Sequence, residues 1–233
     1  MLPNFVCIGA QKTGTTWLYR QLIQHPHVFL PATKELNFFY RDLSPREYEA
    51  HFARAGTALA RGDISPNYMV LPGVAERMHA MLPDAKLICI LREPLSRARS
   101  QFPMAVKLGN IPADMTFIQA FRADLQYLRE RGQYLDLLTR FTRFYASEQI
   151  MILLYDDLLA DPTGFLRQVS SFIGVDRDFV PAGAAERIEA GDSQLHLSDE
   201  DITEVRAFYA PHIAALSQYL GRSLQHWLAV PQS

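Results

Sequence analysis

Cysteine is scarce in this chain of 233 residues. Only Cys7 and Cys89 occur, and each falls in an apolar stretch that predicts a buried strand. Two cysteines cannot build the disulfide framework that stabilises many small secreted domains. We therefore expect both thiols to be small core residues of a protein in a reducing compartment, although neighbouring parallel strands could bring them close together.

The sequence also lacks a long apolar run. A helix that crosses a bilayer needs about 20 consecutive apolar residues, and no stretch of the chain reaches that length. A secretory signal would place a basic segment, an apolar stretch and a cleavage site before the first strand, but the chain enters that strand almost at once. We expect a cytoplasmic protein with no membrane partner.

Positive charge is not in excess either. Lysine and arginine number 23 against 25 aspartates and glutamates, which gives a net charge of −2 at pH 7. A protein that binds nucleic acid normally has a basic excess, so we predict no nucleic-acid partner. The same balance argues weakly against a long polyanionic polysaccharide as substrate. The length suits one α/β core, and we predict a single domain over residues 1–233.

The most informative stretch runs from Asn4 to Leu18, NFVCIGAQKTGTTWL. Its apolar residues 5–8 predict a strand buried on both faces, and helical periodicity resumes after Gly14. Between Gly9 and Gly14 the backbone can turn so that its N–H groups point toward an anion at the positive end of the helix. We therefore predict a strand, an anion-binding loop and a helix. The side chains that could contact a phosphate or sulfate are Lys12, Thr13, Thr15 and Thr16.

This loop lacks the lysine of a nucleotide-triphosphate site. Gly9 and Gly14 have the spacing of Gly-x-x-x-x-Gly-Lys-Ser/Thr. Thr15, however, occupies the lysine position, and Lys12 precedes the second glycine. The magnesium-binding aspartate of such sites ends a later apolar strand, whereas the best later strand, residues 86–92, ends in arginine. A kinase or nucleotide-triphosphate hydrolase remains the alternative function, and we predict no metal site.

Three further features of the sequence are the blocks QKTGTTWL at residues 11–18, KELNFF at residues 34–39 and LREPLSRARSQF at residues 91–102. These blocks resemble the sulfotransferases that use 3′-phosphoadenosine 5′-phosphosulfate (PAPS). Residues 11–18, QKTGTTWL, are similar to the loop that binds the 5′-phosphosulfate. Residues 91–102, LREPLSRARSQF, resemble the segment that binds the 3′-phosphate. Residues 34–39, KELNFF, resemble a Lys-Glu-x-x-Phe-Phe stretch of heparan-type and many bacterial members. The loop block and the 3′-phosphate block occur in the family's order, and the match covers a little under half of the chain.

The resemblance implies an α/β fold, a P-loop-like three-layer sandwich with a central, mostly parallel sheet flanked by helices. It implies PAPS as the cofactor and 3′-phosphoadenosine 5′-phosphate (PAP) as the product, without a metal. The residues that it assigns to cofactor binding are Gln11, Lys12, Thr13, Gly14, Thr15, Thr16, Trp17, Arg92 and Ser100. Arg187 and Gly191 are candidates for a loop that closes over the nucleotide. We expect Arg97 and Arg99 to face solvent or acidic neighbours instead.

The same resemblance implies two catalytic residues, Glu35 and Lys12. Transfer of a sulfuryl group to a hydroxyl or an amine requires removal of the acceptor's proton. Glu35, partly removed from water, would act as the general base. Lys12 would stabilise the charge on the departing phosphate. From the residues alone, a solvated Lys34–Glu35 charge pair beside a hydrophobic clamp is an equal interpretation.

Five residues are predicted to bind the acceptor, a small molecule or a carbohydrate: Lys34, Asn37, Asp63, Ser65 and Tyr68. The last three lie in GDISPNYM, which resembles a Glu/Asp-x-Ser/Thr-Pro-x-Tyr segment of the family, and a strand-to-turn cap is an equal interpretation. Heparan-type members often have histidine at the position of Asn37 and lysine at that of Ile64, so the acceptor contacts differ here. A non-catalytic nucleotide-binding protein of the same fold is the second alternative function.

Hydrophobic periodicity predicts the remaining elements. Apolar runs predict strands at residues 86–91 and 149–155. A helical pattern extends over residues 114–145, and shorter helices are predicted at residues 16–24, 74–82, 161–174 and 198–220, the last bent at Pro211.

Overall fold

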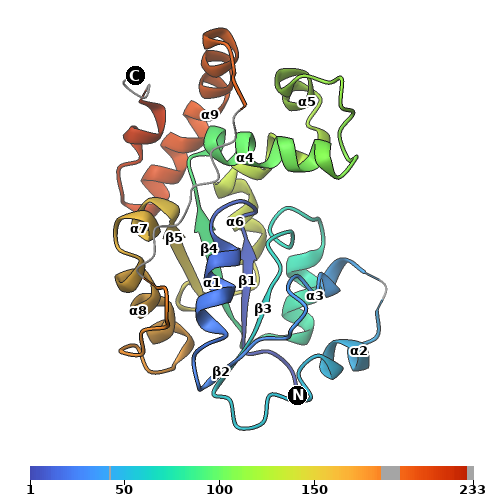
Figure 1. Cartoon of the computed structure of the whole chain (residues 1–233), viewed down its shortest axis with the longest axis vertical. Helices are drawn as coiled ribbons and strands as arrows, with labels where there is room; N and C mark the ends of the chain where they lie inside the picture. Colours follow the sequence, from blue (N-terminus) through green and yellow to red (C-terminus); the bar gives the residue numbers. More distant parts are fainter. Residues whose placement is uncertain (42, 185–194, 230–233) are drawn as a thin grey trace. The chain divides into compact units, whose positions relative to one another are not determined.

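The computed structural model of this protein describes residues 1–41, 43–184 and 195–229. The chain divides into two compact units, Met1–Leu91 with Arg140–Ile188, and Arg92–Thr139 with Glu189–Ser233. Figure 1 shows the chain coloured from the N-terminus to the C-terminus. The single domain expected over residues 1–233 stays a prediction.

The first unit is built around a parallel β-sheet. The described residues form five strands in it, in the order β2-β3-β1-β4-β5. The strands are β1 (Phe5–Gly9), β2 (Val28–Phe29), β3 (Ala60–Ile64), β4 (Lys86–Leu91) and β5 (Ile150–Leu154). Every pairing between these neighbours is parallel. β1 lies at the centre and is buried along its whole length, which explains its unbroken apolar run.

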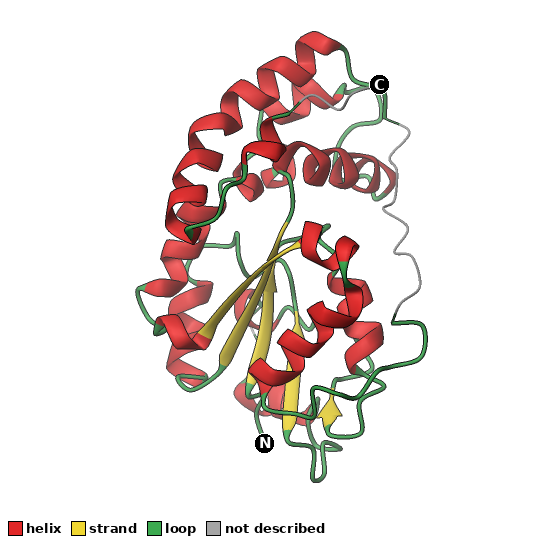
Figure 2. Ribbon diagram, turned by 90° about the vertical axis from the view of Figure 1, so that its left-hand side faces the viewer, coloured by secondary structure: helices red, strands yellow, loops and turns green. Residues whose placement is uncertain are grey.

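Helices flank this sheet, as Figure 2 shows for the strands drawn in yellow, and the predicted α/β sandwich is confirmed. The helices of the first unit are α1 (Thr15–Leu22), α2 (Pro45–Ala50), α3 (Val74–Met81), α7 (Tyr155–Ala160) and α8 (Pro162–Ile173), with 3-10 turns η1 (Phe38–Tyr40) and η4 (Ser147–Gln149). One buried cluster joins Leu18 of α1 and Phe165 of α8 to Ile88 of β4. The apolar faces of α1 and α8 therefore cover the sheet.

Both cysteines lie in this core. Cys7 is on β1 and Cys89 on the neighbouring strand β4, and both are buried and free, as predicted. Cys89 Sγ lies 3.6 Å from Met69 Sδ. Burial raises the pKa of both thiols, so they stay protonated at neutral pH.

The second unit is helical in its described residues. Its elements are α4 (Pro94–Lys107), α5 (Phe117–Arg122), α9 (Asp199–Leu220), η2 (Leu125–Tyr127), η3 (Glu130–Gly132) and η5 (Gln225–Leu228), and α6 (Tyr134–Thr142) begins in it. α9 begins where Ser198 Oγ accepts the Asp201 N–H at 3.1 Å. It continues through Pro211 to Leu220, so the predicted end of this helix is confirmed.

The predicted helical pattern over residues 114–145 is wrong in its middle. After α5 the chain forms short 3-10 turns, and Asp124 and Gln126 have left-handed φ angles of 51° and 56°. Asp124 Oδ1 accepts the N–H groups of Arg129 at 2.7 Å and Glu130 at 3.1 Å. A short carboxylate that bonds nearby amides competes with the helical hydrogen bonds of the backbone. This competition breaks the helix in two.

Arg97, expected to face solvent or acidic neighbours, is fully buried inside the second unit, so the first of these two alternatives is wrong. Its guanidinium donates to Gln101 Oε1 and to the backbone carbonyl of Leu128. Gln101 Nε2 donates in turn to Gln126 O at 2.9 Å. The two side chains thus attach the irregular segment after α5 to helix α4. Arg99 instead donates to Leu195 O at 2.9 Å.

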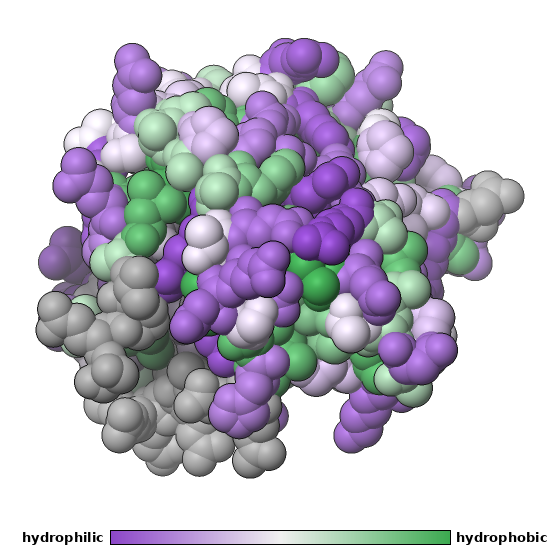
Figure 3. All heavy atoms as spheres, turned by 90° about the horizontal axis from the view of Figure 1, so that it is seen from above, coloured by the Kyte–Doolittle hydropathy of each residue, from purple (hydrophilic) through white to green (hydrophobic). Residues whose placement is uncertain are grey.

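Hydrophilic residues cover most of the coloured surface in Figure 3, and hydrophobic atoms form small patches between them. Large exposed apolar side chains such as Leu59, Leu108 and Leu159 are scattered along the sequence. Within the described part of the chain, no helix has both the length and the apolarity to span a membrane.

The break after α5 gives a first prediction. Asp124→Ala should lower the free energy of unfolding by about 1–3 kcal/mol, because two amides lose their acceptor and alanine tolerates positive φ poorly. Asp124→Asn should retain most of the stability, since its amide oxygen can accept both N–H groups and asparagine tolerates positive φ. Urea denaturation of both variants measures the difference. Equal losses would contradict this account of the break.

Candidate functional site

The predicted anion-binding loop lies between β1 and α1. Gly14, with φ 90°, precedes the helix, and the first helical hydrogen bond connects the N–H of Leu18 to Gly14 O at 3.0 Å. The amides of residues 15–17 come before that bond. No side chain from the described residues caps the helix, and no acidic residue lies in its first turn. The positive end of α1 is therefore suited to an external anion.

Hydrogen bonds and close packing fix the shape of this loop. The buried Thr13 hydroxyl donates to Ala10 O at 2.7 Å, and the Ala10 N–H donates to Ile90 O at 2.8 Å. A Cβ added to Gly14 would lie 2.7 Å from Leu158 Cδ2, because α7 packs directly against the glycine. Thr13 therefore has a structural role in the loop, and the predicted contact between Thr13 and a cofactor stays a prediction.

Most of the remaining predicted loop residues are more accessible than Thr13. Gln11 and Lys12 are partly exposed, Thr16 is exposed and Thr15 is buried. Lys12 has a left-handed φ of 69°. The ring of Trp17 packs edge-on against Phe165, with centroids 6.1 Å apart, and its buried Nε1 has no hydrogen-bond partner among the described residues. An indole N–H is a donor, so this group is available to a bound molecule.

A second segment, residues 34–38, lies near the end of β1. Lys34 Nζ and Glu35 Oε1 are 2.7 Å apart, and their side chains are 18% and 33% exposed. Burial raises the pKa of Cys7 to about 12, and smaller effects come from its hydrogen bond to Gly9 O and from the charges of Lys34, Asp63 and Glu35. Cys7 is the middle residue of β1. The N–H of Asn37 donates to Ser65 Oγ at 3.1 Å, and that of Ser65 donates to Cys7 O at 3.0 Å, so the segment that carries Glu35 lies beside the C-terminal half of β1.

A third segment, residues 65–69, packs against the same strand end. The N–H of Ser65 donates to Cys7 O at 3.0 Å, and that of Met69 donates to Ile8 O at 3.0 Å. A Cβ added to Gly9 would lie 2.8 Å from Met69 Cβ. In parallel α/β sheets the carboxyl ends of the strands are where ligands bind. The anion loop and the segments at residues 34–38 and 65–69 therefore lie at the same edge of the sheet.

Asp63 is the centre of a buried hydrogen-bond cluster at this edge. Its Oδ1 accepts the Ser65 hydroxyl at 2.6 Å, and its Oδ2 accepts the hydroxyls of Tyr68 at 2.8 Å and Tyr48 at 3.0 Å. Burial raises the pKa of Asp63, while the three donated hydrogen bonds act in the opposite direction. Asp63, Ser65 and Tyr68 are fully engaged inside the protein. Their predicted role as acceptor ligands stays a prediction.

Asn37 connects this cluster to the segment that carries Glu35. Its N–H donates to Ser65 Oγ at 3.1 Å, and the next N–H, that of Phe38, donates to the Tyr68 hydroxyl at 2.8 Å. The side-chain Oδ1 of Asn37 is buried and has no partner among the described residues. It is available to a donor group of a bound acceptor.

Tyr48 is the member of this cluster that sequence reasoning missed. From the sequence, Ser44, Pro45 and Glu47 indicate the start of a helix, with Tyr48 and Phe52 on its apolar face. The sequence did contain a signal for this role. Phenylalanine would be sufficient on a purely apolar face, whereas a buried tyrosine hydroxyl usually needs a hydrogen-bond partner.

The two residues predicted to bind a 3′-phosphate, Arg92 and Ser100, belong to the second unit. Arg92 directly follows β4, and its backbone carbonyl accepts the Tyr134 hydroxyl at 2.7 Å. Glu93 then caps α4 by accepting the N–H groups of Leu95 at 2.9 Å and Ser96 at 2.6 Å. Ser100 is partly exposed on α4. Their approach to the anion loop stays a prediction.

Two other predictions concern a closing loop and a metal. Arg187 and Gly191 lie outside the described residues. Among residues 1–41, 43–184 and 195–229, no group of three or more histidine, cysteine, aspartate or glutamate side chains is arranged to hold a metal ion.

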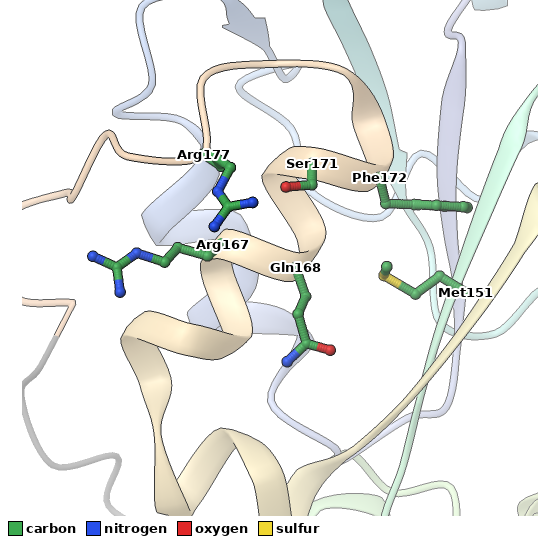
Figure 4. A pocket seen from close by; sticks show the side chains of 6 residues that line it. All are labelled: Met151, Arg167, Gln168, Ser171, Phe172 and Arg177. Atoms are coloured by element: carbon green, nitrogen blue, oxygen red, sulfur yellow. The ribbon is translucent and has the colours of Figure 1, made fainter.

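One pocket of about 450 Å³ lies beside α8 and β5, and none of the predicted site residues lines it. Figure 4 shows Gln168 and Ser171 on α8, with Arg167 extending away from the other labelled side chains. Arg167 also lies 3.9 Å from Asp178. The pocket is thus a separate surface feature of the first unit.

Residues 2–198 match the family model of the sulfotransferase domain. The chain belongs to the sulfotransferase family. A curated mouse relative, heparan sulfate glucosamine 3-O-sulfotransferase 3A1, is 31% identical over 192 residues, which cover 76% of this chain and 47% of the relative. A mouse bifunctional heparan sulfate N-deacetylase/N-sulfotransferase 4 is 27% identical over 97% of this chain and 31% of its own length. This chain therefore spans about half, or less, of the length of these relatives.

Solved sulfotransferase structures share the fold. The crystal structure of a sulfotransferase from Alicyclobacillus acidocaldarius has a TM-score of 0.85 and 28% identity, covering 98% of this chain and 100% of that chain. The mouse sulfotransferase SULT7A1 complexed with PAP has a TM-score of 0.53 and 17% identity, covering 88% of this chain and 62% of that chain. The second likeness is one of fold alone.

The packing of α7 on the sulfotransferase loop gives a second prediction. Gly14→Ala should cost about 2–4 kcal/mol of unfolding free energy, because the new methyl group combines a positive φ with a contact 2.7 Å from Leu158. Gly174→Ala is the matched control: it also has a positive φ, 81°, but open space around the added Cβ. It should cost about 1–2 kcal/mol. Guanidinium denaturation of both variants, of Leu158→Ala and of the double variant Gly14→Ala/Leu158→Ala completes a double-mutant cycle that measures the packing contribution. A loss in the double variant equal to the sum of the two single losses would rule out the contact.

Proposed function

We propose that this protein transfers the sulfuryl group of PAPS to a hydroxyl or an amine, with Glu35 as the general base. The observation that carries the proposal is the shared edge at the end of β1. There, an uncapped helix start lies in the same unit as a partly buried carboxylate. The N–H of Asn37, two residues after Glu35, donates to Ser65 Oγ at 3.1 Å, and the N–H of Ser65 donates to Cys7 O at 3.0 Å on the strand that leads into the loop. A donor of an anionic group and a proton acceptor therefore fit one site.

The residues around the loop fit the 5′ end of a sulfated nucleotide. The amides at the start of α1 suit its anionic oxygens, and the buried Nε1 of Trp17 offers a further donor. When bound, PAPS supplies a sulfuryl group joined to a phosphate that leaves as a stabilised anion. The family match over residues 2–198 supports this donor, as does the PAP complex named among the proteins of similar fold.

Lys12 is the cation that we assign to the leaving phosphate. Its left-handed backbone, with φ 69°, lies inside the loop just before Thr13, whose hydroxyl fixes the loop to Ala10. A cation in a loop of fixed shape needs little reorganisation when charge develops on the leaving phosphate. It therefore stabilises the transition state more than the ground state.

Glu35 is the group that we assign to the acceptor's proton. Its Oε1 is hydrogen-bonded to Lys34 at 2.7 Å, which fixes the direction of the carboxylate. We assign the proton transfer to Oε2. Lys34 and Asn37 flank Glu35 and would orient the acceptor, a small molecule or a carbohydrate. The curated relatives named for heparan sulfate support a carbohydrate as one acceptor class.

Arg92 and Ser100 are the residues that we propose for the 3′-phosphate of the nucleotide. A guanidinium at the end of β4 and a hydroxyl on α4 suit a phosphate dianion on the ribose. The Tyr134 hydroxyl at 2.7 Å and the Glu93 cap fix the backbone on either side of this turn.

The nucleotide assignment gives a third prediction. PAP should raise the melting temperature more than ATP with magnesium does, since a ligand that binds only the folded state stabilises it by mass action. Arg92→Ala should remove the advantage of PAP over adenosine 5′-monophosphate, which lacks the 3′-phosphate. Lys12→Ala should weaken both ligands. Thermal-shift titration measures all three effects. A larger shift with ATP and magnesium, or no response to PAP, would favour the kinase alternative.

The base assignment gives a fourth prediction. Glu35→Gln should lower kcat about 100-fold or more, because a positioned base contributes about 10²–10⁴ in rate. Affinity for PAP should change less than about twofold, since the amide keeps the shape of the side chain. Glu49→Gln is the control. Glu49 is an exposed carboxylate on α2, and its one ion pair among the described residues is with the N-terminal amine at 3.5 Å. Radiolabelled sulfate transfer to a panel of hydroxyl and amine acceptors measures kcat. Full activity of the glutamine variant would overturn the assignment.

A further inference from the structure

The backbone that carries Glu35 has an unusual conformation. Glu35 and Asn37 have left-handed φ angles of 65° and 57°, a region that residues other than glycine rarely occupy. Such a conformation costs free energy, so contacts elsewhere must hold it. Two left-handed residues so close together mean that the position of the Glu35 carboxylate depends on those contacts.

Two buried hydroxyls make the contacts. The Asn37 N–H donates to Ser65 Oγ at 3.1 Å, and the Phe38 N–H donates to the Tyr68 hydroxyl at 2.8 Å. Both hydroxyl side chains are fully buried. A hydrogen bond shielded from water is stronger than one at the surface, and a broken one leaves a buried group unpaired.

Asp63 fixes the direction of these hydroxyls. A hydroxyl has one proton and two lone pairs, and its proton can rotate to suit its surroundings. Ser65 donates its proton to Asp63 Oδ1 at 2.6 Å, and Tyr68 donates its proton to Oδ2 at 2.8 Å. With both protons directed at the carboxylate, the lone pairs are left for the two amides. Asp63 therefore organises two acceptors at once.

Aromatic packing supports the same segment from the buried side. Phe38 stacks on Tyr48 with ring centroids 4.3 Å apart, and Phe39 meets Tyr68 edge-on at 5.3 Å. Tyr48 also donates its hydroxyl to Asp63 Oδ2 at 3.0 Å. Among the contacts of the described residues, however, Tyr48 has no hydrogen bond to the backbone of residues 34–38. Tyr48 and Tyr68 thus each donate a hydrogen bond to Asp63 Oδ2. Within the described part of the chain, only Tyr68 of the two also accepts one from the Phe38 N–H.

We propose that Ser65 and Tyr68, oriented by Asp63, are positioning residues that hold the left-handed backbone at residues 35–38 and so aim the Glu35 carboxylate. This inference rests on the proposed function of Glu35. It gives the Asp-x-Ser-Pro-x-Tyr segment at residues 63–68 the role of positioning the base, in place of the role of binding the acceptor. None of its three polar residues needs to touch a substrate for this role.

The test compares Tyr68→Phe with Tyr48→Phe. Each variant removes one buried hydroxyl and one hydrogen bond to Asp63 Oδ2, and Tyr68→Phe should lose more unfolding free energy because it also leaves the Phe38 N–H unpaired. Only Tyr68→Phe also removes the acceptor of the Phe38 N–H. We expect kcat to fall about ten- to a hundredfold in Tyr68→Phe, because a small misplacement of a reacting group has an effect of this size. In Tyr48→Phe, kcat should fall less than about threefold. KM for PAPS and the affinity for PAP should be unchanged in both.

A second measurement does not depend on activity. Amide hydrogen exchange should become faster at Phe38 in Tyr68→Phe and at Asn37 in Ser65→Ala, while Tyr48→Phe leaves both amides protected. Ser65→Ala also serves as a second positioning variant if Tyr68→Phe folds poorly. Equal loss of kcat in the two tyrosine variants, or equal exchange at Phe38, would overturn the positioning role.

Failure of the proposed function looks different. A fully active Glu35→Gln variant would remove Glu35 as the base, and with it the reason to position that residue. If Glu35→Gln is inactive and Tyr68→Phe and Tyr48→Phe lose the same amount of kcat, Glu35 remains the base and only the positioning role is overturned.

Discussion

The hydrogen bonds that converge on the Asp63 carboxylate are the interaction on which the candidate site depends. Asp63 lies on β3, beside β1, and its three donors come from α2 and from the turn after β3. A buried carboxylate is stable only when its oxygens are satisfied, so these parts must be in place together. The same folded edge of the first unit therefore provides the hydroxyls that bind the backbone of residues 37 and 38.

The anion loop obeys a different constraint, that of close approach. Gly9 lies against Met69, and Gly14 lies against Leu158 of α7, so in both places a side chain would displace a neighbour. The glycines that allow the turn are thus also the ones that let the loop pack on its surroundings. Packing on both sides, together with the Thr13 hydrogen bond, gives the start of α1 a fixed shape before any ligand arrives.

The sequence predicted those features that depend on local patterns. Unbroken apolar runs predicted the strands at residues 5–8 and 86–91, which are buried on both faces, and the glycine spacing predicted the loop. Arg97 could not be placed, because its partners include the backbone carbonyl of Leu128, far along the chain. Likewise, the link from residues 37 and 38 to Ser65 and Tyr68 exists only once β3 pairs with β1. Local periodicity carries no signal for contacts of that kind.

Trp17 has a consequence of its own. The chain has only two tryptophans, and the indole of Trp17 lies at the first turn of α1, packed on Phe165. Indole emission responds to hydrogen bonding and to the polarity around the ring. The loop thus carries a built-in fluorophore, and replacing Trp227 with phenylalanine would leave a single emitter through which occupancy of the loop can be followed by light alone.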